Sequence, residues 1–555
     1  MRLSGLLILL LLVIGLAACQ PTATQPSAPP APVTAAAATA APQSGGTLHY
    51  GLTLAVSGID PHVNASSELG IALSSVYDTL VAQDHAGVFH PFLAQSWSVS
   101  ADGLTYTFKL RQDVTFHDGA PFDAVAVVRN LDRVADPATK SQKAVFLLGP
   151  YDHAEALDDY TVKIVLKAPF APLLDGLSQV YLGMASPAAL DQWGDQYQLH
   201  QVGTGPFRFV SYQERQTLVL ARNPDYRWAP EIRAHQGPAY LDGIEFRFYG
   251  DPATRLPALL SGQADVMGEL PPGDAASIDK STKQTTQPPV KANYILYPVA
   301  VPGQSVQFFL NTTLPPLDDL RVRQALLHAT DRAALVSAVF GPTSPVASGP
   351  LAAVTHGADA ALAGSYGYDV AKARSLLAEA GWTDANGDGI LEREGQPLAL
   401  KSILMSWGEL PKIGTILQAQ WRAVGIDLQL DPLTYPAALE AGRAGTHHMM
   451  PFVISGTDPD LLSTFFHSRN LGGFNWAKVS DPEVDGWLEE AARRLAWPER
   501  ATRYARVQQR VMDQAWILPI RDVVNLNAAS AQMQGLIYDV QGWFPVLYDV
   551  WLAQP

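Results

Sequence analysis

The sequence predicts an α/β protein of several domains that acts outside the cytoplasm. Its first nineteen residues have the composition of a secretory signal. Its 555 residues are too many for one hydrophobic core and indicate roughly three or four domains. In the C-terminal half, a helix, a glycine and a strand follow one another, which is typical of an α/β layer with a partly parallel sheet.

The secretory signal is predicted at residues 1–18. Arg2 gives a basic start, and residues 6–16 are apolar but too few to span a membrane. The run Leu16-Ala17-Ala18 before Cys19 resembles a bacterial lipobox, which implies that Cys19 is lipidated after cleavage. An ordinary signal with an incidental cysteine is the alternative. It is disfavoured because Cys19 is the only cysteine of the chain, whereas secreted proteins usually pair their cysteines.

Residues 19–44 are predicted to be a lipidated cysteine and a tether. The segment after Cys19 is rich in Pro, Ala, Thr and Ser and carries no charge, so it buries too little apolar surface to fold. A flexible chain of this length reaches on the order of 30 Å. Two or three acyl chains would hold it firmly in a membrane. We therefore expect an extracytoplasmic lipoprotein, at the cell surface or in the periplasm.

The composition excludes some classes of function. The formal net charge is −15, and no basic run interrupts it, so binding to nucleic acid is not expected. No later segment is long and apolar enough to cross a membrane. With a single cysteine there is no disulfide within the chain, so stability must come from the core.

Apolar residues alternate with polar ones in the N-terminal half. Trp97 and Val99 lead to an Asp102-Gly103 turn, and residues 104–110 continue the alternation. This pattern predicts a half-buried hairpin. Residues 161–166 repeat the alternation and predict another strand.

Four helices are predicted between residues 318 and 425. Acidic residues near their starts favour the helix dipole, and glycines mark their ends. The starts are Asp318 with Asp319, Asp331, Asp369 and the region of Ile413; glycines end three of them at Gly341, Gly381 and Gly425. Residues 426–430 then form a predicted strand.

A series of short motifs runs through nearly the whole mature chain in a fixed order. They are Leu93–Trp97, Asp102–Arg111, Phe116–Gly119, Phe122–Ala124, Val202–Phe207, Arg222–Tyr226, Asp319–Leu326, Asp331–Arg332, Tyr368–Trp382 and Asp458–Asp460. Through these motifs the chain resembles the bacterial extracellular solute-binding family that serves ABC importers of dipeptides, oligopeptides and nickel. Each motif alone is weak, but the ordered set is specific.

The resemblance implies a two-lobed periplasmic-binding-protein-like fold of type II, with an extra α+β domain inserted in the first lobe. The expected divisions are 45–77, 186–298 and 512–555 for lobe I, 78–185 for the inserted subdomain, and 299–511 for lobe II. It also implies closure about a hinge around a small-molecule or peptide ligand. The expected partners are an ABC permease and ATPase, and the expected state is a monomer.

The resemblance also indicates where a ligand would bind. In peptide-binding members, an acid three residues before the Asp-Pro-Asp segment meets the peptide ammonium; here this position is Ser455. A hydroxyl cannot neutralise a buried ammonium, so simple dipeptides bound in this mode should bind weakly. Asp458 could substitute, or could cap the following helix.

Further candidate ligand contacts come from residue type. Trp407, Asn475 and Trp476 are expected wall residues, because flat aromatic surface with a few polar groups is common in pockets; core packing is the alternative. Gly203 and Thr204 belong to a tight loop expected near the cleft, where a glycine lets backbone approach a ligand.

A calcium site is the only cofactor that the sequence suggests. Asp384, Asn386 and Asp388, followed by Gly389, match the opening of an EF-hand loop. The twelfth position, which should be Glu, is Gly395. Asn-Gly and Asp-Gly pairs are also strong turn formers, so a turn without metal is the alternative.

Enzyme signatures are weak. The chain has no His-Glu-x-x-His, no Gly-x-Ser-x-Gly and no cysteine nucleophile in its body. Ser277 and Lys280 have a Ser-x-x-Lys spacing without its companion motifs. Two other classes of function remain as alternatives: a secreted glycoside hydrolase that uses two carboxylates, and a structural or chaperone-like surface lipoprotein. The solute-binding interpretation is favoured over both, and no catalytic residue is predicted.

Overall fold

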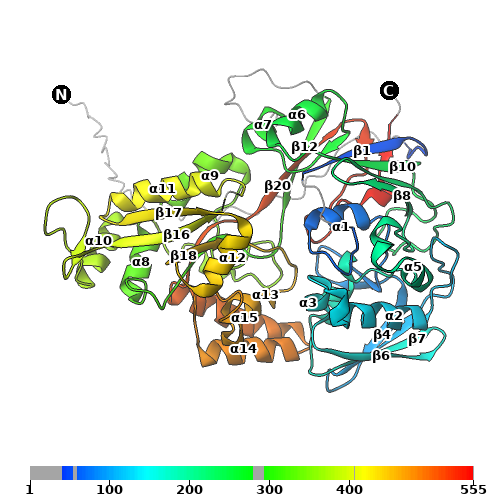
Figure 1. The fold of residues 1–555 in the computed structure, drawn as a ribbon, viewed down its shortest axis with the longest axis horizontal. Helices are drawn as coiled ribbons and strands as arrows, with labels where there is room; N and C mark the ends of the chain where they lie inside the picture. The colour runs from blue at the N-terminus through cyan, green and yellow to red at the C-terminus, as the bar shows by residue number, and fades with distance from the viewer. Residues whose placement is uncertain (1–40, 54–58, 279–292, 406, 554–555) are drawn as a thin grey trace, which may run out of the picture. The chain divides into compact units, whose positions relative to one another are not determined.

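The computed structural model describes residues 41–53, 59–278, 293–405 and 407–553 (Figure 1). The predicted signal peptide, Cys19 and most of the predicted tether lie outside the described residues. The strands and helices described below all belong to the unit that begins at Pro42.

The first lobe is built on a seven-stranded sheet in the order β12-β20-β11-β1-β10-β9-β8. Its strands are β1 (Thr47–Leu52), β8 (Phe207–Gln213), β9 (Thr217–Arg222), β10 (Gly243–Phe248), β11 (Val266–Met267), β12 (Tyr294–Ala300) and β20 (Val524–Ser530). Strand β1 pairs in parallel with β10 and β11, and the other pairs are antiparallel. The sheet therefore unites segments from both ends of the described chain.

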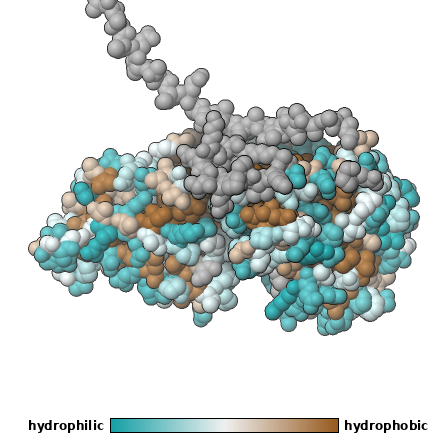
Figure 2. Space-filling view, turned by 90° about the horizontal axis from the view of Figure 1, so that it is seen from above, coloured by the Kyte–Doolittle hydropathy of each residue, from teal (hydrophilic) through white to brown (hydrophobic). Residues whose placement is uncertain are grey.

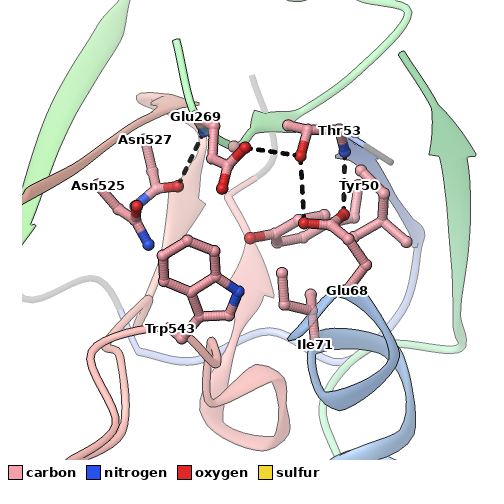
Figure 3. Close-up of a pocket in the computed structure, with 11 residues that line it drawn as sticks. Tyr50, Thr53, Glu68, Ile71, Glu269, Asn525, Asn527 and Trp543 are labelled. Carbon is pink, nitrogen blue, oxygen red and sulfur yellow. Dashed lines mark hydrogen bonds between the residues drawn. The ribbon is translucent and has the colours of Figure 1, made fainter. Parts of the chain in front are cut away.

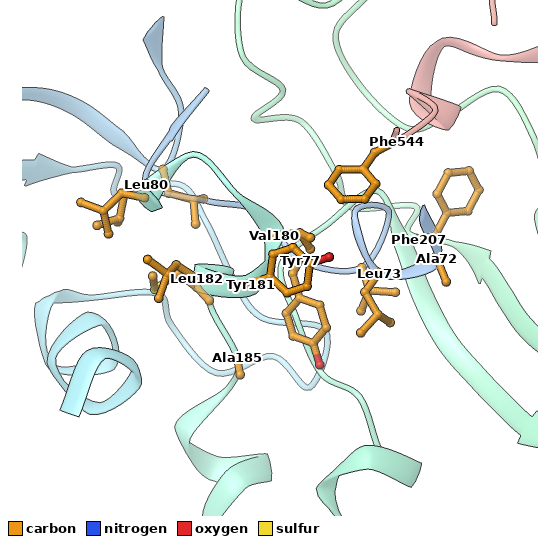
Figure 4. Close-up of a cluster of buried hydrophobic side chains, with 14 of the residues drawn as sticks. Ala72, Leu73, Tyr77, Leu80, Val180, Tyr181, Leu182, Ala185, Phe207 and Phe544 are labelled. Atoms are coloured by element: carbon orange, nitrogen blue, oxygen red, sulfur yellow. The ribbon is translucent and has the colours of Figure 1, made fainter. Parts of the chain in front are cut away.

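The first lobe also contains short helices and a small two-stranded sheet near the C-terminus. The helices are α1 (Ser67–Leu73), α5 (Pro187–Trp193), α6 (Pro252–Leu260) and α7 (Pro272–Ile278), and the small sheet pairs β21 (Met533–Gln534) with β22 (Trp551–Leu552). Figure 4 shows part of the core, where Tyr77, Tyr181 and Phe544 gather from three separate segments. The rings of Tyr181 and Phe544 meet edge to face, with 6.3 Å between centroids.

The inserted subdomain carries a four-stranded antiparallel sheet in the order β4-β5-β7-β6. Its elements are β2 (Val81–Gln83), β3 (Phe89–Pro91), β4 (Ala94–Val99), β5 (Thr105–Leu110), α2 (Ala124–Ala135), α3 (Ala144–Leu148), β6 (Tyr151–Asp158), β7 (Thr161–Leu166) and α4 (Leu173–Leu177). Strands β4 and β5 pair with Trp97 opposite Phe108, which confirms the predicted hairpin. The predicted strand at 161–166 is also confirmed, since β7 pairs with β5.

The second lobe is built on a five-stranded sheet in the order β17-β16-β18-β13-β19. Its strands are β13 (Val306–Leu310), β16 (Ala399–Met405), β17 (Asp427–Leu433), β18 (Met449–Phe452) and β19 (Ile517–Arg521). Strand β16 pairs in parallel with β17 and β18, whereas β13 is antiparallel to its neighbours. The sheet is thus partly parallel, as the sequence predicts.

Eight α-helices of the described chain belong to the second lobe. They are α8 (Leu320–His328), α9 (Arg332–Phe340), α10 (Val370–Glu379), α11 (Leu410–Arg422), α12 (Tyr435–Ala444), α13 (Leu461–Phe466), α14 (Pro482–Arg493) and α15 (Trp497–Asp513). The side chains of Asp319, Asp331 and Asp369 cap α8, α9 and α10 by accepting hydrogen bonds from backbone N–H groups. A two-stranded hairpin, β14 (Glu392–Arg393) with β15 (Gln396–Pro397), precedes β16.

Two large clusters of buried apolar side chains share no residue, one in each lobe. Two segments connect the sheets: residues 301–305 lead from β12 to β13, and residues 522–523 lead from β19 to β20. The N–H of Val301 donates to the carbonyl of Val523 at 3.0 Å, so these segments lie side by side. The division expected at residue 512 does not match the sheets, because β19 belongs to the second lobe and the chain leaves that lobe only after Arg521.

The face in Figure 2 mixes hydrophilic and hydrophobic residues, with the hydrophobic ones in small patches. Within the described ranges, no helix combines the length and the apolar character that a membrane crossing requires.

Candidate functional site

The two lobes touch through the side chain of Thr457, which lies between β18 and α13 of the second lobe. Its hydroxyl donates to Asp175, on α4 of the inserted subdomain, and accepts from Nε2 of Gln541 in the first lobe at 3.2 Å. A backbone bond from the N–H of Ala171 to the carbonyl of Ala492, 2.8 Å long, adds a second crossing. These contacts join the two lobes directly.

An ion pair supports Thr457 from within the second lobe. Nη2 of Arg500 lies 2.7 Å from Oδ1 of Asp458 and 3.1 Å from the hydroxyl of Tyr504. Burial lowers the pKa of Arg500, but Asp458 and Tyr504 outweigh burial and raise it overall. Asp458 also accepts from the N–H of Asp460 at 2.8 Å, so it holds the turn before α13.

Asp175 is an unusual carboxylate because it is buried at the contact between the lobes. Burial, followed by the nearby charge of Asp458, raises the pKa of Asp175 to about 7, while hydrogen bonds from Thr457 and Gln179 oppose the rise. The contact between the lobes therefore contains a carboxyl group whose pKa burial raises well above its ordinary value.

A small pocket lies in the first lobe beside the hinge (Figure 3). It has room for roughly one water molecule. Its polar lining comes from β1, α1, the segment after β11, β20 and the C-terminal loop: Tyr50, Thr53, Glu68, Glu269, Asn525, Asn527 and Trp543. Trp543 is two residues from Gln541, which touches Thr457 of the second lobe.

Two carboxylates of this pocket meet at one hydroxyl. Oγ1 of Thr53 lies 3.1 Å from Oε1 of Glu68 and 2.9 Å from Oε2 of Glu269, as the dashed lines of Figure 3 show. The N–H of Thr53 donates to Glu68 at 3.0 Å. Burial raises the pKa of Glu269, opposed by the bond from Thr53 and by the charge of Arg255. Glu269 also has φ 45, a conformation that costs energy for a residue with a side chain.

Two further charged groups, Lys143 and Asp539, lie near the C-terminal loop that carries Gln541. Nζ of Lys143 lies 4.2 Å from the ring centroid of Tyr181. Burial lowers the pKa of Lys143 to about 8, although Asp175 and Asp539 both raise it. Burial raises the pKa of Asp539 to about 7. Acidic and basic groups thus face one another around the contact between the lobes.

The structure brings Ser455 and Asp458 together at this contact. Ser455 is half-buried and forms a backbone bridge with Gly303 of the hinge segment. A Cβ on Gly303 would lie 2.3 Å from the carbonyl oxygen of Ile454, so the two segments are in very close approach.

Two of the three predicted wall residues, Asn475 and Trp476, are buried within the second lobe. Asn475 is fully buried, and its amide bonds the backbone of His467 and Val479. Trp476 is 2% exposed and packs in the core of the second lobe against Phe452 at 5.8 Å between ring centroids. Trp407 is 52% exposed. The positions of Asn475 and Trp476 match the alternative of core packing.

Gly203 and Thr204 lie inside the first lobe. The Thr204 hydroxyl donates to Asp78 at 2.9 Å, and Trp228 donates to the same carboxylate oxygen at 2.9 Å. A Cβ on Gly203 would lie 2.1 Å from the carbonyl oxygen of Val76. The glycine is therefore required by the close approach of two backbone segments, and the threonine supports a buried carboxylate whose pKa burial raises to about 6.

The predicted calcium loop forms a turn held by its own amides. Asp384 accepts from the N–H groups of Gly387 and Gly389, at 2.8 and 3.1 Å. The Asn386 amide lies 3.2 Å from Asp388 and also contacts Glu392. Across the described ranges, no three His, Cys, Asp or Glu side chains are grouped so that they could hold a metal ion. Calcium at this loop stays a prediction.

Sequence reasoning missed the residues that line the pocket and join the lobes. Asp175 and Thr457 are 282 positions apart, and Thr53 and Glu269 are 216 apart. No spacing rule relates such pairs. The only local signal is that Thr457 immediately precedes the Asp-Pro-Asp motif.

Two sheet-based lobes, joined by two adjacent segments and touching across a polar contact, are the architecture of a two-lobed binding protein. The model of the bacterial extracellular solute-binding proteins, family 5 Middle, matches residues 88–473. The chain is 31% identical over 482 residues to the glutathione-binding protein GsiB of Pectobacterium atrosepticum, covering 85% of this chain and 88% of that protein. It is 30% identical over 485 residues to GsiB of Escherichia coli O1:K1, covering 86% and 89%. The chain belongs to the family 5 bacterial extracellular solute-binding proteins.

Solved structures agree with this assignment. NikA from Brucella suis, in complex with Fe(III)-EDTA, aligns with a TM-score of 0.80 and 26% identity, covering 91% of this chain and 100% of that chain. DppA from Helicobacter pylori, in complex with a peptide, aligns with a TM-score of 0.74 and 24% identity over 92% and 99%, which shows the shared fold. The predicted fold class and the role of a solute-binding protein of an ABC importer are confirmed.

Proposed function

We propose that this protein is a membrane-anchored receptor that binds a small peptide of about the size of glutathione between its lobes. The observation that carries the proposal is the direct contact of Thr457 with both Asp175 and Gln541, which requires closed lobes. The glutathione-binding relatives support a small peptide as the ligand. The sequence supports the membrane anchor, because Cys19 would carry the lipid and residues 20–44 would form the tether.

Closure supplies the mechanism of capture. A ligand shifts the open and closed populations only if it binds the closed form more tightly, so it must contact both lobes. The hinge segments at 301–305 and 522–523 are short and lie together, so a change in a few backbone angles would move one lobe against the other. The closed protein would then be the form that the permease recognises.

We further propose that the bound ligand leaves unchanged and that the protein acts as a monomer. The acidic residues at the contact between the lobes are engaged by Thr457, Gln179 and Arg500, which supports a role in closure and not in chemistry. A calcium ion at the Asp384 loop would be structural and far from this role.

Small-angle scattering with reduced glutathione, together with mass analysis of the ligand before and after incubation, tests the proposal. We expect a smaller radius of gyration with saturating ligand and an unaltered ligand mass. Ligand at about a hundred times its dissociation constant should add roughly 2.7 kcal/mol to the free energy of unfolding. A chemically altered ligand would favour the hydrolase alternative, and an unchanged radius on saturation would reject closure. Native mass spectrometry of the purified protein would identify a retained ligand of another class.

A further inference from the structure

A second pocket of the first lobe is larger than the pocket of Figure 3 and encloses about 80 Å³. A buried water occupies about 10–15 Å³ of such a volume, so the pocket has room for a group of several non-hydrogen atoms. Its walls come mainly from the turn after α1, the loop after β9 and the C-terminal loop. None of the described residues that line it belongs to the second lobe, so the pocket is distinct from the contact at Thr457.

The side chain of Arg233 lines this pocket and has no direct partner there. It is half-buried, and its guanidinium forms no hydrogen bond or ion pair with any described residue. Its backbone N–H donates to the carbonyl of Pro230 at 2.9 Å, which holds the turn of the loop. The planar guanidinium matches the two oxygens of a carboxylate. Arg233 is therefore available to a carboxylate that a ligand would bring.

Two carboxylates of the same pocket lie near Arg233 without pairing with it. Burial raises the pKa of Asp78 to about 6 and that of Asp539 to about 7, and in both cases the charge of Arg233 opposes the rise. Both oxygens of Asp78 already accept from neighbouring side chains. In Asp539, Oδ1 accepts from the N–H groups of Gln541 and Phe544, at 3.0 and 3.4 Å, whereas Oδ2 has no hydrogen bond within the described chain. Asp539 can therefore accept one more donor.

A buried hydroxyl completes the polar lining. Ser75 is 3% exposed, and its carbonyl accepts from the N–H of Phe207 at 2.9 Å, but no described residue bonds its side chain. Buried hydroxyls normally have a partner, so this one indicates a group that a ligand would supply. The rings of Tyr226 and Tyr548, with 5.4 Å between centroids, add an aromatic wall. The pocket thus offers an unpaired cation, a carboxylate oxygen and a hydroxyl.

We propose that this pocket binds an unblocked α-amino-acid group, in which an ammonium and a carboxylate share one carbon. Arg233 binds the carboxylate, Oδ2 of Asp539 accepts from the ammonium, and Ser75 bonds the same head group. A simple anion would be repelled by Asp539 and a simple cation by Arg233, so a group with both charges fits better than either. The inference goes beyond the proposed function, because it assigns a site within the first lobe alone.

The same chemistry occurs in two sources that the experiment separates. The γ-glutamyl end of glutathione carries it, and so does a free amino acid such as L-glutamate. Calorimetry of the full protein uses both compounds, the N-acetyl form of each, and the α-amide of L-glutamate. We expect at least one free compound to bind about tenfold or more tightly than its blocked forms, because each block removes one charge.

Titration of L-glutamate into protein saturated with glutathione distinguishes the sources. Competition would mean that the γ-glutamyl end of glutathione occupies the pocket. Undiminished binding of L-glutamate would mean that the pocket serves a free amino acid while glutathione binds elsewhere. Either result supports an α-amino-acid site, provided that the preference over the blocked forms is present.

The Arg233→Gln variant removes the proposed carboxylate partner, and Arg227→Gln, at an exposed position of the same loop, is the matched control. We expect Arg233→Gln to abolish the preference for the free carboxylate over the α-amide and Arg227→Gln to leave it unchanged. Equal affinity for free and blocked compounds, or a preference that survives in Arg233→Gln, would overturn the site. The comparison of blocked compounds needs no variant, so poor folding of Arg233→Gln would not obscure it.

The failure of this site can be told apart from the failure of the proposed function. If glutathione binds without any preference over its N-acetyl form, peptide capture stands and the α-amino-acid site is rejected. If L-glutamate binds with the expected dependence on Arg233 but glutathione does not bind, the site stands and a glutathione-sized peptide is rejected. If neither compound binds, both are rejected.

Discussion

Nε2 of Gln541 lies 3.2 Å from the hydroxyl oxygen of Thr457, and this hydrogen bond joins the C-terminal loop of the first lobe to the second lobe. The same hydroxyl donates to Asp175, so one side chain connects two separate parts of the first lobe to the second. Gln541 is held in turn by the bond from its own N–H to Asp539 at 3.0 Å. If the lobes close as proposed, changing this contact tests that closure directly.

Thr457→Val should weaken ligand binding by about tenfold. The valine keeps the shape but removes the hydroxyl, which leaves Asp175 and Gln541 without their partner; a buried unpaired group costs roughly 1–3 kcal/mol. Calorimetry with the native ligand measures the affinity, and scattering measures the fraction closed. Thr502→Val on the exposed face of α15 is the control and should change neither. Full affinity in Thr457→Val would show that the contact does not support closure.

Asp539→Asn should make the protein more stable at pH 8 and change the pH dependence of unfolding. Burial raises the pKa of Asp539 to about 7, so between pH 4 and 7 the folded protein holds a proton that the unfolded chain releases. The contribution of this group to stability is complete at low pH and is lost as the pH rises through about 7. Asparagine keeps an oxygen that can accept from the N–H groups of Gln541 and Phe544.

The measurement for Asp539→Asn is denaturant unfolding of both proteins at pH 4.5, 6 and 8, and the quantity of interest is the difference in free energy of unfolding. Burial also lowers the pKa values of His62 and His117 to about 4, which destabilises the fold as the pH falls. Because both proteins retain these histidines, their effect cancels in the difference. A difference that does not change with pH would contradict the prediction.

Gly303→Ala should destabilise the hinge by roughly 2–4 kcal/mol. Gly303 has φ 132, and an added Cβ would lie 2.3 Å from the carbonyl oxygen of Ile454 and 2.7 Å from Cα of Ser455. Gly119→Ala is the control: its φ of 88 is also positive, but its Cβ would meet nothing within 4 Å, so it should cost only about 1–2 kcal/mol. Equal destabilisation of the two variants by thermal unfolding would mean that the close approach is absent.

Cys19→Ser should abolish lipid attachment. The thiol is the acceptor of the lipid in the lipobox pattern, and a hydroxyl at this position would not replace it. Fractionation of cells should find the variant released or with an uncut leader, whereas the unmutated protein stays with the membrane. A Cys19→Ser protein that is processed and still membrane-bound would refute the anchor.

Local features of the fold were predictable because short-range chemistry determines them. The alternation at residues 104–110 follows from one face being buried, and the caps at Asp319, Asp331 and Asp369 follow from the need of a helix start for acceptors. The boundary between the lobes near residue 512 was not predictable in this way. Strand β19 looks like any buried strand, and only its pairing with β13 assigns it to the second lobe.

The candidate site depended on contacts that sequence patterns do not encode. Residue type suggested that Trp407 and Trp476 line a wall. Trp476 is 2% exposed and packs in the core of the second lobe, whereas Trp407 is 52% exposed and stays a predicted wall residue. Thr53 and Glu269 come together because β1 and β11 are neighbours in the first sheet, and Glu68 reaches the same hydroxyl from α1. The motif at Asp458–Asp460 led to the right neighbourhood, since Thr457 precedes it, but not to the residues across the lobes.

The position of β20 has a consequence for the order of folding. This strand lies between β12 and β11, so the first sheet has a gap until residues 524–530 have been synthesised. The four strands β17, β16, β18 and β13 of the second sheet emerge earlier, and β19 joins them at the edge. Lobe II can therefore begin to assemble during synthesis, whereas the first sheet is complete only when almost the whole chain has been made.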